Sequence, residues 1–174
     1  MAAEWGFTMK EFDRIIFVGR AGNSREVMAA ELLKRKGVKN NPEILARGTS
    51  VLFPEPLNQK AEAVLISNGI TLNEFSSTAL TEEDFGENTL ILTFESAMRE
   101  SLFNIFEHPK NVHILTQVTG DELEIFDPTG QEIVTYGLCY EALDKTTTKL
   151  ADVLNEGTYF DEIVTIPDPP EEQA

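Results

Sequence analysis

The segment at residues 17–37, FVGRAGNSREVMAAELLKRKG, has the pattern of a buried strand that leads through a tight loop into a helix. An apolar run ends at Gly19, as is typical of a strand covered on both faces, and Gly37 is a helix stop signal. Small residues in the loop at 19–25 let its N–H groups turn inward, and the helix dipole adds positive charge. We therefore predict a phosphate-binding loop made of Gly19, Arg20, Ala21, Gly22, Asn23, Ser24 and Arg25.

Arg25 begins the predicted helix, where its guanidinium can offer a planar set of donors to a tetrahedral oxyanion. The loop lacks both the Lys-Ser/Thr ending of nucleotide-binding loops and the three-glycine spacing of dinucleotide folds. The alternative is an ordinary strand-to-helix turn, with Arg25 solvated or paired to Glu26.

Strands and helices alternate along the rest of the chain. Alternation of this kind predicts a parallel sheet with right-handed crossovers, so we expect a three-layer α/β/α fold with a four-stranded parallel sheet. Ligands in such folds bind beyond the carboxyl ends of the strands, where the predicted loop follows the first strand. The predicted strands are 13–19, 43–53, 88–94 and 111–118, and the predicted helices are 25–37, 58–69, 81–85, 95–106 and 133–154.

Length and charge limit the classes of function. The 174 residues fit one domain at 13–157, with an N-terminal extension at 1–12 and an acidic, proline-containing tail at 158–174. A net charge of −16 argues against nucleic acid or an anionic membrane as a partner. The chain has no apolar run approaching the ~20 residues that span a bilayer, and residues 1–13 do not resemble a signal peptide. We expect a cytoplasmic protein.

Cysteine and histidine are scarce in the chain. The single cysteine, Cys139, excludes an internal disulfide and a multi-thiolate metal site, and two histidines do not make a metal cluster. We predict no metal and no cofactor. Cys139 lies in the last predicted helix at a spacing that suits a small residue at the edge of the core.

Several stretches, in their order along the chain, resemble the low-molecular-weight protein tyrosine phosphatases, which are related to thioredoxin-coupled arsenate reductases. The family pattern is a strand, then Cys, five residues and Arg. In this chain the strand IIFV and Arg25 fall in register with that pattern. The further matching stretches are ARGTS at 46–50, FPEPLNQKAEAVLISNGI at 53–70, LTEEDF at 80–85, TLILTF at 89–94 and the Asp-Pro pair at 127–128.

The resemblance implies a mechanism in which a thiolate attacks phosphorus, an Arg clamps the oxygens and an Asp protonates the leaving oxygen. Arg25 matches the clamp and Asp127 matches the general acid. The nucleophile is absent: its position is Gly19, or Arg20 if one residue is deleted from the loop. Ser24 stands where many members carry a second cysteine. Loss of a covalent nucleophile typically costs ~10⁶-fold in rate, so the family's cysteine chemistry should be missing.

Other departures from the family also lie at the site. Thr129 and Gly130 replace the family's aromatic residues, and Glu26 replaces the Ser that follows the Arg. One interpretation of Glu26 is an acid in the first turn that complements the helix dipole, worth ~0.3–1 kcal/mol. The other is that it fills the anion site or pairs with Arg25. We adopt the first interpretation. Asp127 before a proline is equally typical of an ordinary turn.

Three functions then compete. The first is a phosphatase-like pseudoenzyme that binds phosphate or a phosphorylated protein with turnover lost. The second is a working phosphomonoesterase in which Asp127 activates water. The third is a non-catalytic interaction domain, such as a homodimer, with an empty loop. We adopt the first of these.

Overall fold

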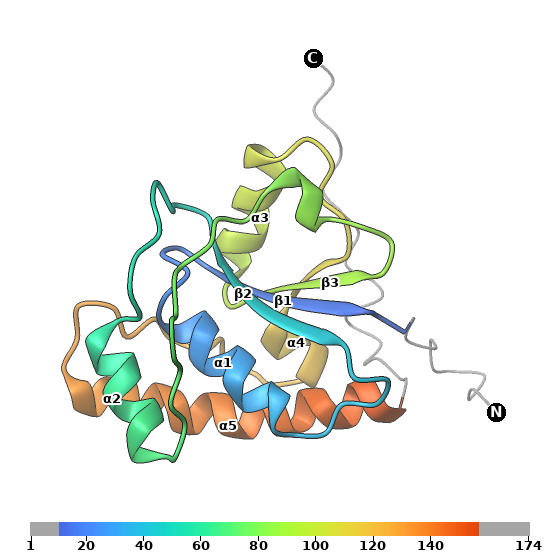
Figure 1. Ribbon diagram of the computed structural model, residues 1–174. Coiled ribbons are helices and arrows are strands. Elements are labelled where there is room, and N and C mark those ends of the chain that lie inside the picture. Colours follow the sequence, from blue (N-terminus) through green and yellow to red (C-terminus); the bar gives the residue numbers. More distant parts are fainter. Residues whose placement is uncertain (1–10, 157–174) are drawn as a thin grey trace.

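In the computed structural model of the chain, the sheet has four parallel strands in the order β2-β1-β3-β4. Figure 1 labels the first three of these strands in the order β2-β1-β3. The structure describes residues 11–156. The predicted α/β fold with a four-stranded parallel sheet is confirmed. The strands are β1 (Arg14–Gly19), β2 (Glu43–Gly48), β3 (Thr89–Thr93) and β4 (Val112–Ile114).

Helices cover both faces of this sheet (Figure 1). The larger core joins α1, α2, α4 and α5 to one face, and the smaller core joins α3 to the other. The long helix α5 packs across α1, α2 and α4. The helices are α1 (Arg25–Lys34), α2 (Gln59–Ser67), α3 (Ser96–Ile105), α4 (Leu115–Thr119) and α5 (Ile133–Glu156), with a short 3₁₀ turn, η1 (Glu82–Asp84).

Strand β1 lies at the centre of the sheet and is buried on both faces. Ile15 and Phe17 pack into the larger core, while Ile16 and Val18 pack into the smaller one. Burying such side chains contributes about 1.5–3 kcal/mol each relative to exposure. This double burial explains why the apolar run in the sequence is unbroken. The loop begins at Gly19, where the run and strand β1 end.

All four predicted strands are longer than the observed ones, the first and third by one or two residues and the second and fourth by five. Residues 111–118 form only a short strand, β4, which is followed directly by α4; Gly120 ends that helix at a φ of 79°. A short apolar run does not by itself distinguish a strand from a buried helix. The predicted strand at 43–53 ends at Gly48. The predicted cap of α2 is confirmed, since the Asn58 side chain accepts hydrogen bonds from two backbone N–H groups.

The N-terminal extension and the acidic tail fall almost entirely outside the described residues. In the part of the chain from 11 to 156, no helix combines the length and the apolar character needed to cross a bilayer.

Candidate functional site

The loop at 19–25 leaves the carboxyl end of β1 and is anchored to the segment that follows β2. The Thr49 N–H donates to the Gly19 carbonyl at 3.0 Å, and the Ser50 N–H donates to the Arg20 carbonyl at 2.9 Å. Gly48 has no room for a side chain, because a Cβ there would lie 2.7 Å from the Gly22 backbone nitrogen. Close backbone packing therefore holds the loop at the sheet edge where ligands bind in this class of fold.

A second anchor joins the loop to the start of α2. The Asn23 side-chain amide donates to the Pro56 carbonyl at 3.0 Å, and the Asn58 N–H donates to the Asn23 carbonyl at 2.9 Å. Gly22, at a φ of 74°, adopts the left-handed conformation that a glycine takes at little cost. Hydrogen bonds therefore hold the loop to two segments, the one that follows β2 and the one that precedes α2.

The carboxylate of Glu26 lies inside this loop. Its Oε1 accepts a hydrogen bond from the Ser24 N–H at 2.8 Å, and a Cβ on Gly19 would lie only 1.8 Å from its Oε2. Glu26 is 3% exposed. The carboxylate therefore occupies the space that a side chain at residue 19 would fill. Glu26 lies in the first turn of α1, as the adopted interpretation expects, and its carboxylate also turns into the predicted phosphate-binding loop, as the other interpretation expects.

Burial raises the pKa of the Glu26 carboxyl above its ordinary value. The hydrogen bonds from Ser24 and from its own N–H, and the charge of Arg25, lower that pKa, while Asp127 raises it further. The net shift is upward. The loop thus holds an anion whose charged form is disfavoured by its surroundings.

The guanidinium of Arg25 is buried and has partners from two other segments. Its Nη1 donates to the Ile125 carbonyl at 2.7 Å, and its Nη2 pairs with Glu95 Oε1 at 2.5 Å. Its central carbon lies 4.3 Å from the centre of the Phe94 ring, within the range of a cation–π contact. Arg25 therefore joins α1 to the start of α3 and to the segment before α5. Its role as a clamp on phosphate stays a prediction.

Ser24 contributes a second feature to the loop. Its hydroxyl oxygen is buried and has no hydrogen-bond partner among residues 11–156. A buried hydroxyl without a partner costs about 1–3 kcal/mol, and an oxyanion in the loop would supply the acceptor that it lacks.

Asp127, the predicted general acid, lies on the exposed loop before α5. Its Oδ1 accepts two hydrogen bonds from Thr129, from the N–H at 3.0 Å and from the hydroxyl at 2.7 Å. Burial raises the pKa of Asp127, but these two hydrogen bonds and the charges of Arg25 and Arg20 outweigh burial and hold the pKa below its ordinary value. A carboxyl with a lowered pKa is ionised near neutral pH, so it carries no proton to donate to a leaving group.

Cys139 is a buried residue of α5. It donates a weak hydrogen bond to the Phe126 carbonyl, with the sulfur 3.6 Å from the oxygen. Burial raises its pKa to about 12, and Arg25, Asp127 and Glu26 all act on it electrostatically. The thiol is therefore protonated at neutral pH, and a protonated thiol is a poor nucleophile. No group of acidic, histidine or cysteine side chains within 11–156 could hold a metal ion.

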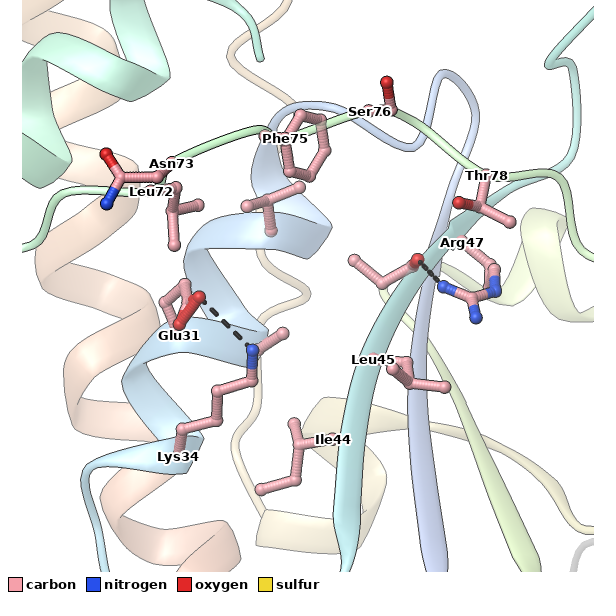
Figure 2. Close-up of a pocket in the computed structure, with 13 residues that line it drawn as sticks. Glu31, Lys34, Ile44, Leu45, Arg47, Leu72, Asn73, Phe75, Ser76 and Thr78 are labelled. Carbon is pink, nitrogen blue, oxygen red and sulfur yellow. Dashed lines mark hydrogen bonds and ion pairs between the residues drawn. The ribbon is translucent and has the colours of Figure 1, made fainter. Parts of the chain in front are cut away.

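A separate pocket of about 240 Å³ lies between α1, β2 and the segment at 72–78 (Figure 2). Its walls are partly apolar. On the α1 side Glu31 pairs with Lys34 at 3.2 Å, and on the β2 side the Arg47 guanidinium donates to the carbonyl of Ala46 at 2.9 Å. None of the loop residues at 19–25 lines it. This pocket could not be predicted from the sequence, because its apolar side chains have the same spacing as core positions.

Comparison with known proteins places this site in context. The sequence model for "Low molecular weight phosphotyrosine protein phosphatase" matches residues 14–159. The chain is 24% identical over 143 residues to the low molecular weight protein-tyrosine-phosphatase PtpB of Staphylococcus epidermidis, covering 82% of this chain and 95% of that one.

Solved structures of two bacterial phosphatases share the fold. The YwlE arginine phosphatase from Geobacillus stearothermophilus superposes with a TM-score of 0.74 at 28% identity, covering 82% of this chain and 93% of that one. The tyrosine phosphatase Wzb from Escherichia coli K30, solved in complex with sulphate, gives a TM-score of 0.72 at 22% identity, covering 82% of this chain and 99% of that one.

Proposed function

Because the chain belongs to the low molecular weight phosphotyrosine protein phosphatase family, we propose that it binds phosphate or a phosphorylated partner without cysteine-based turnover. The observation that carries this proposal is the hydrogen bond from the Ser24 N–H to a carboxylate, because it means that the loop at 19–25 already holds an anion. A backbone N–H that donates to a carboxylate oxygen can also donate to a phosphate oxygen.

Two further features support oxyanion binding. The unpartnered Ser24 hydroxyl is a donor without an acceptor. The positive charge of Arg25, whose guanidinium is paired with Glu95, acts on the Glu26 carboxyl inside the loop. The loop also precedes the N-terminus of α1, where the helix dipole favours negative charge.

The loss of family turnover is supported by the nucleophile position. Gly19 carries no side chain, and the protonated thiol of Cys139 already donates to a carbonyl elsewhere. The pKa of Asp127 is also lowered, which makes this carboxylate a weak base for activating water. The hydrolase alternative therefore has less support than binding without turnover.

The test is thermal unfolding of the purified protein with phosphate and with tungstate, beside an assay of p-nitrophenyl phosphate hydrolysis. We expect the anions to raise the melting temperature and the ester to stay intact. Ser24→Ala removes the free hydroxyl and should reduce the shift, whereas Arg35→Ala, at the residue that caps the C-terminal end of α1, should keep it. Release of p-nitrophenol that Asp127→Asn abolishes would contradict the loss of turnover. Absence of any shift at millimolar anion would favour an interaction domain.

A further inference from the structure

We propose that Glu26 is the resident anion of the loop, and that an external oxyanion enters the loop only when the Glu26 carboxylate takes up a proton. This inference rests on the proposed function, since it specifies how binding at that same loop is controlled. It is carried by the position of the carboxylate and by the charges around it.

The position makes the two anions competitors. The Glu26 carboxylate accepts from the Ser24 N–H and lies against the Cα of Gly19, at the base of the loop. A tetrahedral anion seated on the same amide would meet this carboxylate. The carboxylate takes its present position because residue 19 is glycine, since a Cβ there would overlap Oε2 and force the carboxylate to shift.

The charges around the loop also oppose a second anion. The groups that act on Glu26 are Arg25 of α1, Asp127 of the segment before α5, and the thiol of Cys139 on α5, which is protonated at neutral pH. Arg25 is the cation among them, and it is already paired with Glu95. Arg20, a second cation in the loop, acts on Asp127. With both Glu26 and Asp127 ionised, the loop would gain a phosphate only against the repulsion of two carboxylates.

Protonation removes this obstacle. A neutral Glu26 carboxyl no longer repels an oxyanion, and its hydrogen bond from the Ser24 N–H is weaker because it is no longer charge-assisted. The side chain can then move off this N–H and donate its own hydrogen to the oxyanion that replaces it. Burial already disfavours the ionised form, so the proton is taken up at a pH above the ordinary value for Glu. If one proton enters with each anion, affinity falls up to tenfold for each unit of pH above the pKa of Glu26.

The experiment measures sulfate binding between pH 5 and 8 by calorimetry. Sulfate keeps the same charge over this range, so any pH dependence belongs to the protein, and Asp127 titrates below it because its pKa is lowered. We expect wild-type affinity to decrease as pH rises, by up to tenfold per unit. Glu26→Gln should bind sulfate at least tenfold more tightly than wild type at pH 7.5, with little dependence on pH.

The matched control is Glu31→Gln, which alters another buried acid of α1 that pairs with Lys34 and lies outside the loop. It should keep the wild-type pH dependence. If Glu26→Gln does not fold, as judged by circular dichroism, Glu26→Ser replaces it, since Ser is the family's residue at this position.

The outcomes separate this inference from the proposed function. If wild type and the Glu26 variant bind sulfate equally at every pH, the inference is wrong and the proposed function stands. If neither binds at any pH, the proposed function fails, and the inference fails with it.

Discussion

Restoring the thiol in two different backgrounds tests the part that Glu26 plays in the loop. Gly19→Cys alone adds a Cβ 1.8 Å from the position of Glu26 Oε2 and 2.6 Å from its Cδ. The carboxylate must therefore shift, but it stays in the same buried loop. Gly19→Cys combined with Glu26→Ser removes the carboxylate and restores the residue pair that the family carries.

The expected difference follows from Coulomb's law. A thiolate and a carboxylate about 4 Å apart repel by about 4 kcal/mol at an effective dielectric constant of about 20. That repulsion corresponds to a pKa of the introduced thiol about 3 units higher in the single variant than in the double variant. At a given pH below both values, the single variant then has about 10³-fold less thiolate.

Alkylation by iodoacetamide as a function of pH measures the pKa of the introduced thiol, and hydrolysis of p-nitrophenyl phosphate measures turnover. The native thiol of Cys139 should not interfere, because its pKa is about 12. Gly19→Cys combined with Glu31→Ser is the control and should behave like the single variant. Equal thiol pKa values in the single and double variants would refute the placement of the Glu26 carboxylate in the loop.

Two further predictions concern groups around the site. The Cys139 thiol should resist a thiol reagent such as Ellman's reagent at pH 8 in the native protein and react fully on unfolding, because burial raises its pKa to about 12; rapid labelling of folded protein would contradict this. Burial raises the pKa of Asp121, but hydrogen bonds from Lys149 and Thr119 outweigh burial and hold the pKa below 3.8. Asp121 therefore stabilises the fold above pH 3.8 and loses that contribution as pH falls through its folded pKa. Asp121→Asn should cost about 1–2 kcal/mol at pH 7 and less near pH 3, as measured by urea unfolding; a cost independent of pH would refute it.

The sheet could be predicted from the sequence because its signals are local. The run from Ile15 to Val18 is apolar because it is buried on both faces. The cap of α2 is an asparagine, Asn58, a residue type that commonly caps helices. The ends of the second and fourth strands could not be predicted, because they depend on contacts between distant segments. Strand β2 ends where Gly48 meets the backbone of Gly22, and neither glycine indicates the other in the sequence.

The direction of the Glu26 side chain could not be predicted either, because it also depends on a contact with another residue of the chain. Taken alone, an acid in the first turn of a helix indicates a partner for the helix dipole, and Glu26 does lie in the first turn of α1. Its carboxylate turns into the loop because Gly19, seven residues earlier, leaves a space without a side chain. Taken separately, each departure from the family pattern fits an ordinary structural role: a glycine in a tight turn, and an acid that complements the helix dipole. Taken together, a missing side chain and an added carboxylate fit the same space, so one substitution makes the other sterically possible.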